Sequence, residues 1–160
     1  MNKKWKHFLT ESETKNVGIV VCLNDKQQFL TIRRSDIDSR AGQWTLPGGH
    51  IDDDDRSIEA GAVRELYEEA NLRCKISDLT YLGEPKPKKY YFLTQKWAGD
   101  VNVNKSNPKT NEIEHDAYKW LTIEQVKEID NTEIPIYLLE KALKQIRCNS
   151  YEDTNNKSKD

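Results

Sequence analysis

The sequence predicts an α/β domain in which β-structure dominates, and two patterns support this prediction. Apolar runs of strand length recur on both sides of a central amphipathic segment, and two more helical segments follow them. The predicted order of elements is β-β-β-α-β-β-β-α-α. The runs with strand composition are 17–23, 28–34, 44–46, 74–83, 89–99 and 117–121, and the helical segments are 57–70, 122–129 and 134–148.

Length and composition indicate one folded domain. A chain of 160 residues, of which 36% are hydrophobic and 32% charged, can bury a core and remain globular. We expect the domain to span residues 1–148. Residues 149–160 carry too few apolar side chains to order themselves, and we expect them to form a disordered C-terminal tail.

Charge and cysteine content exclude several classes of protein. The net charge of −2 gives no global attraction for nucleic acid or for an anionic membrane, so a small-molecule nucleotide partner is favoured. The three cysteines are odd in number and lack metal-site spacing, as expected for small core residues in a reducing compartment. No stretch has the length of a signal-peptide core or a membrane span. We therefore expect a cytoplasmic monomer or homodimer.

The first three predicted strands lead to a glycine pair. The residues between the first two strands, 24–27, have turn composition, which predicts a β-hairpin. A polar loop at 35–43 and a short strand at 44–46 follow. That strand ends at Pro47-Gly48-Gly49, where we expect the glycines to permit a turn after the stiff proline.

The central helix is predicted to run from about Ser57 to Ala70. Ser57 is a suitable N-cap, and Glu59 lies in the first turn, where a negative charge is favourable. Asn71 follows the last turn, and asparagine tolerates the left-handed backbone that ends many helices. Later in the chain, Thr122 is suited to open a short helix, and the last helix has the apolar spacing needed to cover a sheet.

Three glutamates share one face of the central helix. At about 100° per residue, Glu65, Glu68 and Glu69 fall within one narrow arc, with Gly61 a turn earlier. Like charges at this spacing destabilise a helix by about a few tenths of a kcal/mol per pair. A hard divalent cation would reverse that cost, and Gly61 would leave room for a ligand. A solvated acidic face is the alternative, and the spacing by itself does not choose between the two.

The glycine pair and the acidic helix together resemble a known signature. The stretch GGHIDDDDRSIEAGAVRELYEEANL, residues 48–72, is similar to that of the Nudix hydrolases, G-x5-E-x7-R-E-U-x-E-E-x-G-U, in which U is apolar. The flanking sequences GQWTLPGG and EHDAYKWLTIEQV also resemble common Nudix flanks. The resemblance implies an α/β/α sandwich around a mixed central β-sheet, with a loop-helix-loop metal site, and this agrees with the predicted order of elements.

The resemblance assigns roles to individual residues. Glu65, Glu68 and Glu69 match the metal-binding glutamates, and Gly48 matches the residue whose carbonyl often joins them. Arg64 matches the arginine that orients the glutamates. The implied cofactor is Mg²⁺ or Mn²⁺, held by these carboxylates and by substrate phosphates.

Two positions depart from the signature. Asn71 replaces the final glycine, a change that keeps the left-handed option. The first signature glutamate is missing: counting forward from Gly49 reaches Asp55, whereas counting back from Arg64 reaches Arg56. Asp55 is therefore either a shorter stand-in across a one-residue insertion or one of several solvated loop aspartates.

The implied reaction is hydrolysis of the pyrophosphate bond of a nucleoside diphosphate linked to another group. Water attacks phosphorus, and a carboxylate acts as general base. The candidate bases are Glu65 and two loop residues, Glu112 and Glu114, for which a solvated loop is the alternative. His115 fits a satisfied surface histidine better than a ligand.

Candidate substrate contacts lie outside the signature. Arg33 and Arg34 end a strand near the expected pocket, where they can hold phosphate oxygens bidentately, although salt-bridged surface arginines fit equally well. Tyr90 can stack on a base. Trp44 fits a packing residue better than a stacking one.

The substrate class rests on weaker signals. Pro87 lies 15 residues after Leu72, near the position where ADP-ribose hydrolases tend to carry proline. Tyr90 lies 18 residues after it, near where hydrolases of diadenosine polyphosphates tend to carry tyrosine. The sequence thus favours ADP-ribose or a dinucleoside polyphosphate. The alternatives are a Nudix nucleotide-binding module with little or no activity and, from the basic segment 86–89, an RNA 5′-end pyrophosphohydrolase.

Overall fold

The structure, a computed structural model, describes residues 15–37, 39–130 and 132–157. The strands are β1 (Val17–Cys22), β2 (Phe29–Arg34), β3 (Trp44–Thr45), β4 (Gly48–His50), β5 (Thr80–Lys86), β6 (Lys89–Thr94) and β7 (His115–Leu121). The helices are α2 (Ile58–Ala70), α3 (Ile123–Lys127), α4 (Ile136–Lys157) and a short 3-10 helix (Ile76–Asp78), which replaces the start of the strand predicted at 74–83.

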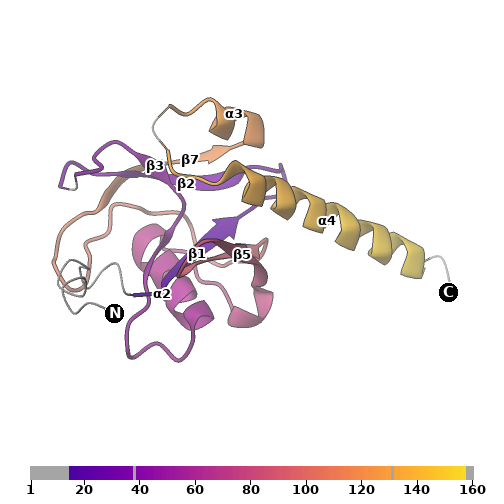
Figure 1. Cartoon of the computed structure of the whole chain (residues 1–160), viewed down its shortest axis with the longest axis horizontal. Helices are drawn as coiled ribbons and strands as arrows, with labels where there is room; N and C mark the ends of the chain where they lie inside the picture. Colours follow the sequence, from indigo (N-terminus) through magenta and orange to yellow (C-terminus); the bar gives the residue numbers. More distant parts are fainter. Residues whose placement is uncertain (1–14, 38, 131, 158–160) are drawn as a thin grey trace, which may run out of the picture.

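Two sheets stand side by side (Figure 1). The first has the order β4-β1-β6-β5 and is mixed, because β1 runs parallel to β6 and antiparallel to β4. The second, β3-β2-β7, is antiparallel. The mixed sheet agrees with the predicted α/β class.

The predicted hairpin of the first two strands is wrong. The chain does turn back between them, since the Asn24 carbonyl accepts a hydrogen bond from the amide of Gln27, but only one isolated bridge joins Leu23 to Phe29. The strands then enter different sheets. Apolar side chains on both faces of β1 require cover on both sides, which suits a central position better than a hairpin edge.

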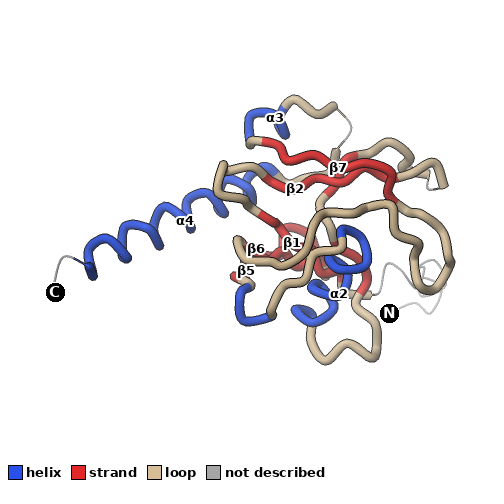
Figure 2. Tube along the Cα trace, turned by 180° about the vertical axis from the view of Figure 1, so that it is seen from behind, coloured by secondary structure: helices blue, strands red, loops and turns tan. Residues whose placement is uncertain are grey.

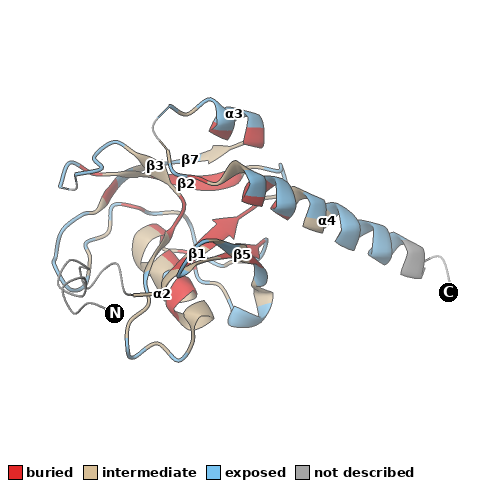
Figure 3. Cartoon of the chain, in the orientation of Figure 1, coloured by how far each residue is buried: buried red, intermediate tan, exposed pale blue. Residues whose placement is uncertain are grey.

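Helices cover both faces of the mixed sheet (Figure 2). On one face, Leu66 of α2 packs in a cluster with Val20 of β1. On the other face, Leu138 of α4 packs in a cluster with Val21. Adjacent valines serve the two layers because strand side chains alternate between faces. This arrangement is the expected α/β/α sandwich. In Figure 3 the buried residues, in red, lie within α2 and in the first turns of α4.

The boundaries of α2 confirm the prediction. The Ser57 hydroxyl accepts a hydrogen bond from the amide of Ala60 at 3.0 Å. At the other end, Asn71 has a left-handed backbone with φ of 63°, and its amide donates to the Tyr67 carbonyl. Thr122 likewise caps α3 as predicted, in a reciprocal pair with Gln125.

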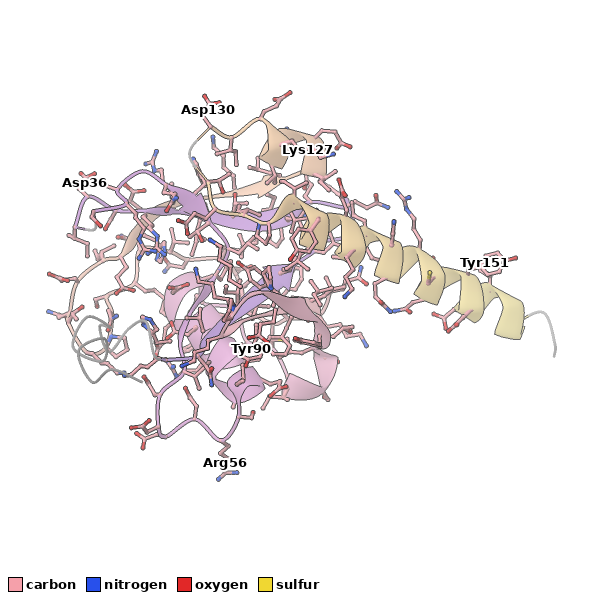
Figure 4. The ribbon with its side chains drawn as sticks, in the orientation of Figure 1. Asp36, Arg56, Tyr90, Lys127, Asp130 and Tyr151 are labelled. Carbon is pink, nitrogen blue, oxygen red and sulfur yellow. The ribbon has the colours of Figure 1, made fainter. Side chains whose placement is uncertain are left out.

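The end of α4 differs from the predicted tail. The helix continues through Lys157, beyond the rest of the molecule, and Tyr151 on this extension is 71% exposed (Figure 4). Helical backbone hydrogen bonds need no apolar partner, and the Thr154 hydroxyl adds one to the Ser150 carbonyl at 3.2 Å. Residues 158–160 lie outside the described residues. In the described part of the chain, no helix combines the length and apolar composition needed to cross a membrane.

Candidate active site

The glycine pair lies in a strand rather than in a turn. Gly48 and Gly49 belong to β4, opposite Ile19 and Gly18 of β1, and neither has a positive φ. What they supply is space. A Cβ on Gly48 would lie 2.5 Å from the Gly18 carbonyl oxygen, and one on Gly49 would lie 2.5 Å from the carboxyl carbon of Glu65. Glycine therefore lets the carboxylates of α2 lie directly against β4.

Glu69 is held against β4 by a backbone donor. The Gly48 amide donates to Glu69 Oε2 at 2.8 Å. Burial raises the pKa of the Glu69 carboxyl well above its usual range, and the nearby Glu65 raises it further, against the lowering effect of the Gly48 amide. The ionised form of Glu69 is thus disfavoured unless a cation comes close.

Arg64 links the acidic residues on the other side of α2. Its Nη1 donates to Glu65 Oε1 and to Glu68 Oε2, both at 3.0 Å. Its Nη2 donates to the His50 carbonyl at 3.0 Å and lies 3.4 Å from Asp52 Oδ2. These contacts are compatible with the orienting role that the resemblance implies.

Of the two positions reached by counting, Asp55 is the one that pairs with Arg64. Arg64 Nε and Nη2 donate to its two carboxylate oxygens, each at 3.0 Å, in a bidentate pair. Asp55 also accepts from the Asp52 amide at 2.8 Å. Arg56, the alternative by counting, points outward from the loop (Figure 4). Gly61 makes room for this arrangement rather than for a ligand, because a Cβ there would lie 2.8 Å from Asp55 Oδ2.

The remaining carboxylates line a cavity of about 540 Å³. Glu65 and Glu69 reach it from α2, and Glu112 and Glu114 reach it from the loop before β7. Burial raises the pKa of Glu65 to about 7, against the lowering effect of Arg64. Glu68 is not among the lining residues and lies on the Arg64 side.

Two adjacent residues of the loop and β7 approach Glu69. Glu114 is held by Asn107, whose Nδ2 donates to Glu114 Oε1 at 2.8 Å. Ligand atoms of Glu69, Glu114 and His115 all lie within 4.8 Å of one another. His115 is only 3% exposed, so the expected surface histidine is wrong. No local spacing in the sequence could reveal this triplet, because Glu69 and His115 are 46 residues apart.

The residues that the sequence suggests for substrate contact do not lie together in the structure. Arg34 lines the acidic cavity, whereas Arg33 Nε donates to Asp116 at 2.7 Å, with its guanidinium 5.8 Å from the centre of the Trp44 ring. Adjacent residues of a strand face opposite sides, so one of the two arginines had to point away. Tyr90 packs with the α2-side core cluster and is not brought to the cavity.

A second, basic cavity of about 610 Å³ adjoins the acidic one. The two share Arg34, Arg40, Gly48, Gly49 and His50. Basic residues from separate parts of the chain gather here, although the net charge is negative. The lining lysines are Lys15, Lys86, Lys88 and Lys89.

Known proteins with similar sequences and structures are consistent with this site. The NUDIX domain family matches residues 13–141. An RNA pyrophosphohydrolase of Bartonella tribocorum is 32% identical over 139 residues, 72% of this chain and 79% of the relative. One of Pasteurella multocida is 31% identical over 127 residues, 67% of this chain but 60% of the relative, so the chain spans less than two thirds of that protein. The crystal structure of a MutT NUDIX hydrolase from Burkholderia pseudomallei superposes with a TM-score of 0.60 at 21% identity, over 79% of this chain and 95% of the other, which shows a shared fold.

Proposed function

The chain belongs to the Nudix family, and from this premise we propose that it is a divalent-metal-dependent pyrophosphohydrolase of nucleotide substrates. The observation that carries the proposal is the convergence of Glu65, Glu69 and Glu114 on one cavity beside a strand of glycines.

The residues present fit a divalent cation. Burial raises the pKa of both Glu65 and Glu69; neighbouring carboxylates, Glu68 and Glu114 for the first and Glu65 and Glu114 for the second, raise it further, so the site holds more negative charge than its neighbours neutralise. The resemblance implies the carboxylates of Glu65, Glu68 and Glu69 and the Gly48 carbonyl as donors. Of these carboxylates, Glu69 lines the cavity as a candidate donor, and Glu68 is turned to Arg64. Glu65, which also lines the cavity, is a candidate proton acceptor. A cation bound there would neutralise pyrophosphate charge and lower the pKa of water.

Three side chains are placed to handle a proton from water. Glu65, Glu112 and Glu114 line the same cavity. The pKa of Glu65, about 7, suits a proton acceptor that works near neutral pH. Arg64 donates to Glu65 Oε1, and the Glu65 carboxylate lies directly against Gly49 of β4. We assign the general base to Glu65, with Arg64 as its positioning residue.

We further propose that the substrate is the 5′-polyphosphate end of RNA. The basic cavity continues from the carboxylates, so a chain of phosphates leaving the acidic cavity would meet Arg34, Arg40 and the lysines of 86–89. Relatives that are about a third identical carry the name RNA pyrophosphohydrolase. Tyr90, the residue that favoured dinucleoside polyphosphates, supports them less in the structure because it packs in the α2-side core.

A panel of substrates tests both parts of the proposal, the pyrophosphohydrolase activity and the RNA substrate. With Mg²⁺ or Mn²⁺, we expect pyrophosphate release from a 5′-triphosphorylated RNA, leaving a 5′-monophosphate. Cleavage of ADP-ribose or diadenosine tetraphosphate alone would keep the hydrolase assignment and replace the substrate. Of these two, ADP-ribose is the one that Pro87, a residue lining the basic cavity, favours. Tight nucleotide binding without turnover of any substrate would indicate a binding module instead.

The lysines provide a sharper test of RNA recognition. Three contacts to single-stranded phosphates correspond to roughly a 20-fold loss of affinity between 50 and 200 mM salt. The triple variant of Lys86, Lys88 and Lys89 to alanine should lose most of this salt dependence. The matched control replaces Lys26, Lys127 and Lys144, which line a separate cavity near α3 and α4, and should keep it. Equal behaviour of the two triple variants would exclude the proposed path.

A further inference from the structure

Strand β7 contains a β-bulge beside the active site. Its pairing with β2 is regular up to Arg33 opposite Ala117, but the next pair joins Arg34 to His115. Asp116 is therefore the extra residue on β7. A bulge of this kind re-aims the side chains next to it, because one added residue changes which of them faces each side of the sheet.

The bulge sends neighbouring side chains to opposite faces. Asp116 accepts the hydrogen bond from Arg33 Nε at 2.7 Å on the exposed side of the sheet. His115 is opposite Arg34, which lines the acidic cavity, and is almost fully buried. With regular pairing, Asp116 would face Arg34 and His115 would share the side of Arg33. The backbone irregularity thus brings an imidazole to the carboxylates.

The distances suit a shared cation. Ligand atoms of Glu69, Glu114 and His115 lie within 4.8 Å of one another. Oxygen and nitrogen atoms around one divalent ion at about 2.1 Å lie at most about 4.2 Å apart, so small side-chain rotations would close the set. The three groups come from α2, from the loop before β7 and from the first residue of β7.

We propose that His115 is a nitrogen ligand of a divalent cation bound with Glu69 and Glu114, an inference that rests on the proposed metal-dependent function. An imidazole donor favours the later first-row ions, whereas an all-oxygen set suits Mg²⁺. The site should therefore bind Co²⁺ more tightly than Mg²⁺, and His115 should be the cause of most of this preference.

Electron spin echo spectroscopy of the Mn²⁺-loaded protein tests this directly. Coordinated histidine couples its nitrogen to the Mn²⁺ spin, and growth on ¹⁵N-histidine should change that modulation. The measurement uses the wild-type chain, so it does not depend on the folding of a variant. Bound Mn²⁺ without any histidine coupling would overturn the proposal and leave the hydrolase assignment standing. Failure to bind any divalent cation would overturn both.

Single variants identify which histidine is responsible. The chain has three histidines, and His50 serves as a matched control because it also lines the cavity. His115→Asn should abolish the nitrogen coupling and weaken Co²⁺ binding by about tenfold or more, with a smaller change for Mg²⁺. His50→Asn should retain the coupling, as should the same change at His7, which lies outside the described residues. Coupling that survives in His115→Asn would refute the assignment.

Discussion

The acidic residues of the 52–55 loop and of α2 fall into two groups with opposite electrostatics. In the first, Asp55 and Asp52 have a pKa below the usual range, chiefly because Arg64 and Lys109 donate hydrogen bonds to them. In the second, Glu65 and Glu69 have a pKa above the usual range, chiefly because they are buried. The two groups lie on either side of a single arginine.

This contrast explains how the chain tolerates so much negative charge in one place. The first group is neutralised by cations of the chain itself and serves to orient Arg64. The second group retains unneutralised charge in a partly buried cavity, which raises the free energy of the ion-free protein. A bound cation would lower it again. The first group is thus structural, and the second is the part that we expect to act on substrate.

Removing a carboxylate from the second group should have the largest effect on activity. We expect Glu69→Gln to lower kcat by about 10³-fold, equivalent to about 4 kcal/mol of transition-state stabilisation. The ion-free variant should also unfold at higher urea concentration than the wild type, because a disfavoured buried charge is gone. Steady-state kinetics and urea denaturation measure the two effects. Glu59→Gln, a matched change in the first turn of the same helix, should keep full activity; a Glu69 variant as active as this control would remove Glu69 from the site.

Replacing Arg64, whose guanidinium neutralises the first group, should mainly lower the free energy of unfolding. Arg64→Ala leaves Asp55 without its bidentate partner, so we expect the free energy of unfolding to fall by about 3 kcal/mol. Arg64→Lys should recover less than half of this loss, because an ammonium cannot make the forked pair. Chemical denaturation gives both values. A loss below about 1 kcal/mol would mean that solvent, rather than Arg64, balances the loop aspartates.

The pH dependence of stability should separate the two groups. The folded-state pKa of Glu65, about 7, exceeds the unfolded value of 4.5, so the folded protein binds more protons between these values. Stability of the ion-free protein should therefore fall as pH rises from about 4.5 to 7, by on the order of 3 kcal/mol for this one group. The aspartates, with lowered pKa, act in the opposite sense and at lower pH: their contribution is lost as pH falls through the folded-state pKa.

The control for this pH effect is Glu65→Gln, which should reduce the slope between pH 5 and 7 and leave the part that Glu69, whose pKa is also raised, contributes. Saturating Mn²⁺ should reverse it, because ligand carboxylates must be deprotonated to bind. Urea denaturation in EDTA and in Mn²⁺ at several pH values provides the comparison. An ion-free wild type that gains stability over this range would contradict the raised pKa of Glu65.

The local parts of this arrangement could be predicted from the sequence. The caps Ser57 and Asn71 and the three-glutamate face of α2 follow from residue type and spacing, and the structure confirms the helix boundaries. For Asp55 the sequence leaves two interpretations open, a stand-in for the missing glutamate or a solvated loop aspartate. Counting shows the one-residue offset but not which side chain Arg64 reaches. Helix caps and the face that a residue takes on a helix depend on a few adjacent residues, which is why these predictions succeeded.

The rest depended on contacts between distant residues. The glycine pair has turn composition, yet pairing with β1 makes it a strand, and only the close approach of Gly18 and Glu65 shows why glycine is needed. The bulge that buries His115 arises from its register with β2 and leaves no mark in residue spacing. Three lysines of the basic cavity stand in the 86–89 segment, which the sequence marks as basic, but the approach of this segment to Lys15, Arg34 and Arg40 depends on the fold.

The smallest predicted effect concerns Lys109, which joins the first group to the loop that carries Glu112 and Glu114. Its Nζ lies 2.8 Å from Asp52 Oδ2, but its side chain is 70% exposed. Exposed pairs contribute about 0.2–1 kcal/mol, so Lys109→Ala should lower stability by less than about 1 kcal/mol, and less still in high salt. A double-mutant cycle with Asp52→Asn at low and high salt isolates the pair. A coupling energy above about 2 kcal/mol would mean that Lys109 carries as much of the charge balance as Arg64, and the first group would then have two centres instead of one.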